Sequence, residues 1–267
     1  MVSEAASDRR SWIAGRLLAH GGVTIAEITE RFGVSRMTAH RDLDDLARDG
    51  LARKVRGGAS VTPSTLFESD VRFRSTQQPA AKQALSAAAA GWLDPGVAVL
   101  VDESTTTLPL LDHLAAVAPC TVITNFRPAL ERLADTAPDD VEVLALGGRH
   151  HRRFDSFTGP SCVAQLEVLH ADVYVTSTTA VSDGGAWHPD AEIAATKRAM
   201  LRAARQRLLL VDHSKLGRVA LHRVADLDAF DAVIVEDRTP DAEIGRLAAH
   251  GARIHLAPPP DEQDQAS

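Results

Sequence analysis

The amino-acid sequence predicts an α/β protein made of a small N-terminal winged helix-turn-helix domain and a larger domain with a mostly parallel β-sheet. Two patterns indicate this. From about residue 79 onward, short and wholly apolar runs alternate with stretches of helical periodicity, as expected for strands buried between two layers of helices. In the first 60 residues, three helical patterns precede a basic hairpin pattern, which is the element order of a winged helix-turn-helix.

Length and composition are those of an ordinary globular protein. The 267 residues are 45% apolar and 24% charged, which allows one large and one small domain. No run reaches about 18 apolar residues, and the first residues, MVSEAASDRRSW, lack the apolar stretch of a secretory signal. We therefore expect a cytoplasmic protein without a membrane partner. Cys120 and Cys162 stand singly in apolar settings, which favours reduced core thiols over a disulfide or a zinc site.

Charge divides the chain at about residue 60. The first 60 residues contain ten basic and eight acidic side chains, a net charge of +2. The remaining residues contain 19 basic and 28 acidic side chains, and the whole chain carries a net charge of −7. Because an acidic body repels DNA, any contact with nucleic acid must come from the N-terminal segment.

The first two helices are predicted from their apolar spacing and their caps. In DRRSWIAGRLLAHGG, apolar residues recur at helical spacing and a glycine pair follows as a C-cap. In TIAEITERFG, Thr24 precedes Glu27 by three residues, the spacing of a capping box, and Gly33 ends the helix. A tight turn at Gly33 and Val34 then leads into a third helix.

The third helix and the hairpin after it are predicted to carry the DNA-binding surface. Ser35 is the expected N-cap, and Ala39, Leu43 and Leu46 form the expected buried stripe. The alternative, a helical packing module with solvated charges, explains any one of these helices but not their order together with a basic wing. The predicted DNA contacts are Ser35, Arg36, Thr38, His40, Arg41, Arg53, Lys54 and Arg56.

Four segments are predicted along the chain. They are a DNA-binding domain at 1–60, a linker at 61–78, an α/β domain at 79–258 and a polar tail at 259–267. Strands are expected in the α/β domain at 97–102, 121–124, 141–148, 171–178, 207–212, 231–237 and 253–257. Helices are expected at 80–93, 105–116, 128–135, 162–170, 190–206 and 240–250.

A ligand site is predicted where the strands of the α/β domain end, because ligands of parallel sheets bind outside the carboxyl ends of the strands. Hydroxyl groups, carboxylates and two lysines converge there, which suits a small phosphorylated, carboxylated or polyhydroxylated metabolite. The predicted effector-binding residues are Asp102, Glu103, Ser104, Thr105, Thr106, Thr107, Asn125, Gly147, Gly148, Lys197, Asp212 and Lys215.

The chain resembles the DeoR family of bacterial transcription regulators in both parts. The N-terminal match is VSRMTAHRDLDDLARDGLARKVRGGA, and the later matches are VDESTTT, VITN, LALGG, AEIAATKRAM and VDHSKLG, in order over nearly the whole chain. The resemblance implies operator DNA as partner, a sheet related to ribose-5-phosphate isomerase and acyl-CoA transferase folds, a sugar phosphate or related effector, and a homo-oligomer. The expected mode of regulation is repression of transcription. Asp42 is interpreted as a structural acid that holds neighbouring arginines.

The sequence departs from the family pattern in the predicted ligand loop. The family reads Asp-Ser-Gly-Thr-Thr there, whereas Glu103 and Ser104 replace the Ser-Gly pair, and His213 replaces a serine further on. An added carboxylate repels phosphate, and the missing glycine removes the residue that lets backbone amides approach closely. A phosphorylated sugar and an unphosphorylated sugar, polyol or amine therefore both remain open as effectors.

An enzymatic role is the alternative to sensing. Asp102 or Glu103 as base and Lys197 or Lys215 as electrophile would suit an aldose-ketose isomerase. Because the same chain carries a predicted DNA-binding segment, the site can serve to sense a ligand without catalysing a reaction. We therefore expect that the protein is not an enzyme. The sequence shows no cofactor-binding or hydrolase motif, and no cofactor is expected. The histidines in GGRHHRRFDSF lack metal-ligand spacing, so no metal is expected either.

Overall fold

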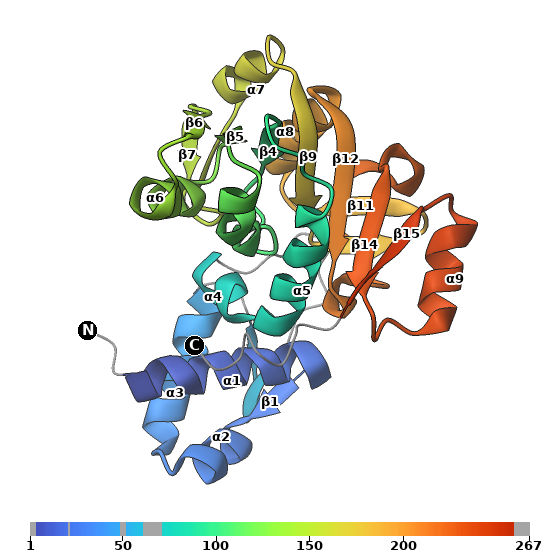
Figure 1. Ribbon diagram of the computed structural model, residues 1–267. Coiled ribbons are helices and arrows are strands. Elements are labelled where there is room, and N and C mark those ends of the chain that lie inside the picture. The colour runs from blue at the N-terminus through green and yellow to red at the C-terminus, as the bar shows by residue number, and fades with distance from the viewer. Residues whose placement is uncertain (1–3, 21, 49–51, 61–70, 259–267) are drawn as a thin grey trace. The chain divides into compact units, whose positions relative to one another are not determined.

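The computed structural model describes residues 4–20, 22–48, 52–60 and 71–258 (Figure 1). The chain divides into two compact units, Met1–Thr76 and Gln77–Ser267. Of the predicted linker, residues 61–70 lie outside the described part, and Val71–Thr76 forms helix α4. The predicted polar tail at 259–267 and the first glycine of the predicted C-cap, Gly21, also lie outside it.

The first unit is a winged helix-turn-helix, as the sequence predicts. Its elements are α1 (Glu4–His20), β1 (Gly22–Thr24), α2 (Ile25–Phe32), α3 (Arg36–Arg48), β2 (Arg53–Val55) and β3 (Gly58–Ser60). The three strands form an antiparallel sheet in the order β1-β3-β2. The sequence predicts only the β2-β3 hairpin. The pairing of β1 with β3 depends on Gly58, where an added Cβ would lie 2.1 Å from the carbonyl oxygen of Val23.

Local signals of the N-terminal unit are confirmed by the structure. Thr24 and Glu27 form the capping box, with each side chain accepting from the other residue's backbone N-H. Gly33 ends α2 in the left-handed region at φ +61°, a conformation that favours glycine. The stripe of Ala39, Leu43 and Leu46 is buried in the unit's core.

The second unit is built on a seven-stranded sheet in which every neighbouring pair is parallel. The strand order is β15-β14-β12-β9-β4-β5-β6. The strands are β4 (Ala98–Val101), β5 (Cys120–Thr124), β6 (Val141–Ala145), β9 (Ala171–Ser177), β12 (Ala204–Val211), β14 (Ala232–Glu236) and β15 (Ile254–Ala257). All seven coincide with strands that the sequence predicts.

Helices cover both faces of this sheet, as Figure 1 shows for the region around β9 and β12. They are α5 (Pro79–Ala90), the 3₁₀ helix η1 (Leu108–Ala116), α6 (Arg127–Thr136), α7 (Pro160–Leu166), α8 (Ala191–Arg202), α9 (Asp241–Ala249) and the short 3₁₀ helices η2 (His213–Lys215) and η3 (Leu227–Ala229). Residues 208–211 of β12 are all buried, so neither face of that strand is open to solvent.

Three predicted helices differ clearly from the observed ones. The helix expected at 162–170 is α7, which ends at Leu166. The helix expected at 105–116 begins only at Leu108 and is a 3₁₀ helix. The helix expected at 190–206 ends at Arg202, because Ala204 already pairs with Ala171 in the sheet. Pairing in the sheet thus overrides the helical propensity of the residues after Arg202.

A small antiparallel sheet and a separate hairpin were not predicted. The sheet has the order β10-β11-β13, from Ala180–Ser182, Gly185–His188 and His222–Asp226, and the hairpin joins β7 (Arg149–His151) to β8 (Ser156–Thr158). Asp183 and Gly184, both at positive φ, form the two-residue turn between β10 and β11. An Asp-Gly pair is a strong hairpin signal, so the sequence did contain this information.

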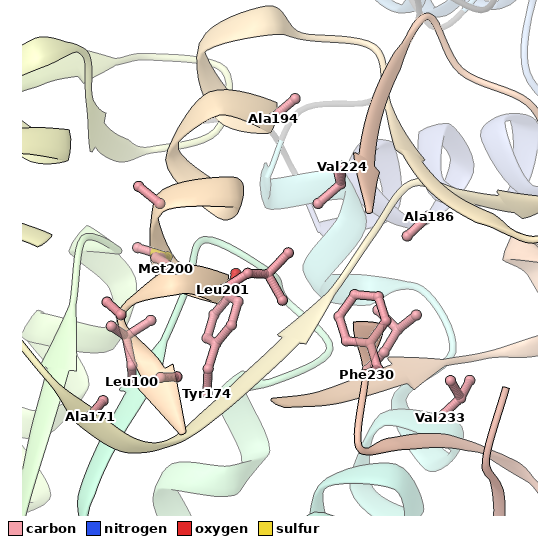
Figure 2. Packing of buried hydrophobic residues seen from close by; sticks show 14 of the residues in the cluster. Leu100, Ala171, Tyr174, Ala186, Ala194, Met200, Leu201, Val224, Phe230 and Val233 are labelled. Atoms are coloured by element: carbon pink, nitrogen blue, oxygen red, sulfur yellow. The ribbon is translucent and has the colours of Figure 1, made fainter. Parts of the chain in front are cut away.

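One core cluster of the second unit joins residues of the sheet to residues of α7 and α8. Figure 2 shows Tyr174 of β9 beside Leu201 of α8, with Leu100 and Met200 close by. Cys162 belongs to this core, and burial raises the pKa of its thiol to about 11, so the thiolate does not form near neutral pH. Among the described helices, none has the length and apolar character needed to cross a membrane.

Candidate functional site

Residues 102–107 form a buried loop after β4, which lies between β9 and β5 in the sheet. All six side chains of this 102–107 loop are at most 6% exposed. The loop is closed internally, because Ser104 N-H donates to Asp102 Oδ1 and Thr107 N-H donates to the Ser104 carbonyl, each at 3.1 Å. The helix that follows is a 3₁₀ helix that begins at Leu108.

Asp102 and Lys197 form a fully buried ion pair at the base of the loop. Lys197 Nζ lies 2.5 Å from Asp102 Oδ2 and also donates to the Ser177 carbonyl at 3.0 Å. Tyr174 donates to the same carboxylate oxygen at 2.6 Å, and Thr176 donates to it as well. Burial alone would raise the pKa of Asp102, but the positive charge of Lys197 and these hydrogen bonds lower it. Both partners of the pair are therefore charged.

Glu103 adds a second carboxylate to Lys197. Its Oε1 lies 2.8 Å from Lys197 Nζ, and the side chain is 2% exposed. Burial alone would lower the pKa of Lys197, but Asp102 and Glu103 together raise it. Glu103 Oε2 is buried and accepts no hydrogen bond from a described residue.

Lys215 joins the loop from η2. Its Nζ donates to Thr106 Oγ1 at 2.7 Å and to Ser177 Oγ at 2.6 Å, and it lies 3.1 Å from Asp212 Oδ2. Burial would raise the pKa of Asp212, but Lys215 and the hydrogen bonds from Ser214 lower it to about 2. The predicted residues Asp102, Thr106, Lys197, Asp212 and Lys215 are thus joined in one buried network.

Lys82 is a third lysine at the loop, and the sequence analysis missed it. It lies on α5, is 5% exposed, and donates to Thr105 Oγ1 at 3.1 Å. From the next turn of α5, Ser86 Oγ donates to the Thr106 carbonyl at 3.0 Å. The available signal was a lone lysine in the otherwise apolar run of AAKQALSAAAA, where a buried position requires a polar partner.

Asn125 follows β5, the neighbour of β4, and the Gly147-Gly148 pair follows β6, the next strand in the sheet. Asn125 is fully buried, its Nδ2 donates to the Phe157 carbonyl at 2.8 Å, and its Oδ1 accepts no hydrogen bond from a described residue. Gln165 bonds both the N-H and the carbonyl of Gly147. Gly148 lies against β8, where an added Cβ would be 2.5 Å from the Thr158 carbonyl oxygen. The absence of a side chain at Gly148 therefore allows its backbone to pack closely against β8.

The histidines of the β7-β8 hairpin pair with carboxylates and do not gather around a common point. His150 contacts Asp155 at 2.8 Å, and His151 contacts Asp190 at 3.2 Å. The hydrogen bond with His151 is the main reason that the pKa of Asp190 is low. Within the described ranges, no three His, Cys, Asp or Glu residues are arranged to hold a metal ion.

The exposed face of α3 carries the predicted DNA-contacting side chains. Arg36 and Arg41 are exposed, His40 is half-buried, and Met37 is 66% exposed. Neither arginine pairs with a carboxylate of the described residues. Ser35 has a local role, because its Oγ accepts from Thr38 N-H at 3.1 Å and lies 3.0 Å from Thr38 Oγ1. These two hydroxyl side chains cap the helix.

The wing presents its three basic residues differently. Arg53 and Arg56 are exposed. Lys54 is exposed as well, and in the hairpin register it is opposite Ala59. Lys54 donates to Asp44 Oδ1 of α3 at 2.5 Å. Its charge is therefore partly compensated within the protein, which the sequence did not indicate.

Two family models match these two units. One, described as "DeoR-like helix-turn-helix domain", matches residues 9–65. The other, described as "DeoR C terminal sensor domain", matches residues 77–237. The chain belongs to the DeoR family of transcription regulators. As in other DeoR-family chains, a DNA-binding helix-turn-helix domain thus precedes a sensor domain.

Two relatives resemble this DeoR-family chain over nearly its full length. It is 31% identical over 250 residues to the uncharacterized HTH-type transcriptional regulator YgbI of Escherichia coli strain K12, covering 94% of this chain and 97% of that one. It is 29% identical over 254 residues to a putative aga operon transcriptional repressor of Escherichia coli O157:H7, covering 94% and 93%. These relatives are regulators and not enzymes, as expected for this chain.

Among solved structures, ribose 5-phosphate isomerase A from Neisseria gonorrhoeae aligns with 54% of this DeoR-family chain and 56% of its own. The TM-score is 0.39 and the sequence identity is 14%. A likeness this distant has no bearing on the activity of the DeoR-family sensor domain.

Proposed function

We propose that this regulator binds operator DNA through the exposed face of α3 and the wing, and that a small carbohydrate metabolite at the 102–107 loop changes its affinity for DNA. The observation that supports the DNA contact is that α3 has one buried apolar face and one exposed basic face. Ala39 and Leu43 are fully buried in the core, whereas Arg36 and Arg41 are exposed and unpaired with described carboxylates. An exposed arginine pair after a tight turn suits the major groove.

The 102–107 loop supports the sensing role. It joins hydroxyl and carboxylate groups to lysines from α5, α8 and η2, so a ligand that rearranges the loop acts on three elements at once. We assign DNA binding to residues 1–60 and ligand binding to residues 79–258. Ligand control then requires the ligand to prefer one of two arrangements of the protein that differ in DNA affinity.

Repression of a carbohydrate operon and a homo-oligomeric state belong to the same proposal. The putative aga operon transcriptional repressor is similar along nearly the whole chain, which supports an operon as the target. A symmetric oligomer would present two copies of α3, and it would recognise repeated or palindromic half-sites.

The test of this proposal is a gel shift at fixed salt with DNA from upstream of the regulator's neighbouring genes. We expect Arg41→Ala to weaken binding about 10- to 100-fold, since a bidentate arginine-base contact contributes about 1–3 kcal/mol. Arg16→Ala is the matched control, because it removes the same charge from α1, where Arg16 pairs with Glu27. Equal affinities of Arg41→Ala and Arg16→Ala would show that α3 does not read the operator.

A further inference from the structure

The ammonium group of Lys197 has no donor left for a ligand. It has three N-H donors and lies within 3.2 Å of Asp102 Oδ2, Glu103 Oε1, the Ser177 carbonyl and Ser104 Oγ. Two of these acceptors are carboxylates. A phosphate group would have to displace one of them from a buried ion pair, which is costly in a site that excludes water.

Lys215 is satisfied in the same way. Its three donors are matched by Thr106 Oγ1, Ser177 Oγ and Asp212 Oδ2, at 2.7, 2.6 and 3.1 Å. Asp212 is in turn fixed by Ser214, whose backbone N-H donates to Asp212 Oδ1 at 3.0 Å. The two lysines that a phosphate-binding site would use therefore already hold the protein's own acceptors.

Two buried side-chain oxygen atoms at the ends of β4 and β5 lack a hydrogen bond within the described part of the chain. Glu103 Oε2 and Asn125 Oδ1 are buried, and neither receives a hydrogen bond from a described residue. They follow adjacent strands, since Val101 of β4 is opposite Thr124 of β5. Asn125 Nδ2 donates to the Phe157 carbonyl, which fixes the orientation of the amide and leaves Oδ1 as the open atom. A buried acceptor without a partner is costly, so a ligand that donates hydrogen bonds here gains most.

The formal charges at the loop cancel. Three ammonium groups, those of Lys82, Lys197 and Lys215, stand against the three carboxylates of Asp102, Glu103 and Asp212. A phosphate ester would bring about two further negative charges into this surrounding. A hydroxylated neutral ligand brings none. Backbone N-H groups of the loop can donate to a hydroxyl oxygen or to a phosphate oxygen, so they do not discriminate between the two.

We propose that the 102–107 loop binds a neutral polyhydroxylated ligand, an unphosphorylated sugar or sugar alcohol, and that Glu103 is the residue that selects it over the phosphate ester. Glu103 Oε2 accepts a hydrogen bond from one ligand hydroxyl, and Asn125 Oδ1 accepts from another. The inference rests on the proposed function, because it assigns the ligand class of the sensing site.

The experiment is a thermal-shift titration of the full-length protein with matched pairs. Each pair is a four- to six-carbon aldose, ketose or sugar alcohol and its phosphate ester, with inorganic phosphate and the corresponding amino sugars alongside. For wild type, we expect at least one neutral compound to reach its half-maximal shift at a concentration at least tenfold lower than its phosphate ester does. This comparison needs no variant and is decisive by itself.

Two variants then test the role of Glu103 in selecting the ligand. Glu103→Gln should raise the half-maximal concentration of the active neutral compound about tenfold, since it removes a charged acceptor. Glu103→Gly should lower that of the phosphate ester. Glu142→Gln is the matched control, because Glu142 is exposed on β6, and its titration should equal that of wild type.

Three results would overturn the inference. They are stabilisation of wild type by phosphate esters at lower concentrations than their neutral partners, a stronger response to an amino sugar than to its neutral parent, and no response to any neutral compound. Each leaves the proposed function standing if a metabolite added to the gel shift changes the affinity of the protein for operator DNA. Conversely, a neutral compound that stabilises the protein without changing operator affinity supports the inference and contradicts the proposed function.

Discussion

Asp42 of α3 and Arg9 of α1 form a two-point ion pair inside the winged helix-turn-helix. Arg9 Nε lies 2.6 Å from Asp42 Oδ2, and Arg9 Nη2 lies 3.2 Å from Asp42 Oδ1. The residues are only 8% and 4% exposed. This pair holds α3 against α1. The aspartate is therefore a structural acid that holds arginines, and these are Arg9 and, at 3.7 Å, Arg10 of α1.

Replacing Asp42 should destabilise the N-terminal unit strongly. Asp42→Ala leaves the Arg9 guanidinium without its nearly buried counter-ion, and removing one partner of such a pair costs about 3 kcal/mol. The measurement is urea unfolding followed by the fluorescence of Trp12, which lies on α1, in a background with Trp92→Phe and Trp187→Phe. Asp45→Asn is the control, because its pair with Arg10 is partly exposed and contributes less than about 1 kcal/mol. Equal losses in the two variants would refute the structural role of Asp42.

Removing Asp44 should strengthen non-specific DNA binding. Asp44 engages Lys54 at 2.5 Å, so Asp44→Asn frees one ammonium of the wing for a DNA phosphate. Released counter-ions would make the dependence of log affinity on log salt steeper by about one unit. Fluorescence anisotropy with random-sequence duplex at several salt concentrations measures this slope. Asp45→Asn makes the same change in net charge in the same helix, and a slope that rises equally in both variants would contradict the role of Lys54.

The buried lysine of the ligand site should be required for the fold of the second unit. Lys197→Met leaves Asp102 and Glu103 buried without their shared counter-ion, and we expect a loss of about 3–5 kcal/mol in unfolding free energy. The double variant Lys197→Met with Asp102→Asn should recover part of the loss, because it removes one of the uncompensated charges. Urea unfolding followed by Trp187 fluorescence tests both. A double variant less stable than the single one would contradict this account.

Acid should weaken the second unit through Asp212. Its pKa falls from 3.8 to about 2 on folding, with Lys215 as the main opposing cause to burial. Since the folded pKa lies below the unfolded one, the ionised group stabilises the fold above about pH 4, and this contribution disappears as the pH falls toward 2. The shift corresponds to about 2 kcal/mol. Asp212→Asn should reduce the loss of unfolding free energy between pH 4 and pH 2, as measured by urea unfolding. The same pH dependence in the variant and in wild type would contradict this role of Asp212.

Regular elements with strong local signals were predictable from the sequence. The capping box at Thr24, the glycine that ends α2 and the apolar strands of the parallel sheet all appear where their patterns indicate. The residues after Arg202 show the limit, since their helical propensity is overridden by pairing of Ala204 with Ala171. Pairing between distant segments is not encoded in local periodicity.

The sequence predicted where the candidate site lies in the fold, but not which of its residues contact one another. The ends of parallel strands meet at one edge, and this rule placed Asp102, Asn125 and Asp212 at the same edge of the sheet. It could not show that Lys197 is shared by two carboxylates or that Gln165 bonds the backbone of Gly147. Lys82 was missed because it comes before the first strand of the sheet, and only tertiary packing brings α5 to the loop.

Lys82 also connects two parts of the chain, one through its side chain and the other through its backbone. Its ammonium group holds Thr105, while its backbone N-H donates to the carbonyl of Gln78 at 3.0 Å. Gln78 has a left-handed backbone at φ +51°, directly before α5 and two residues after α4 ends. One helical turn therefore separates Lys82, which holds the 102–107 loop, from Gln78 near the start of the second unit.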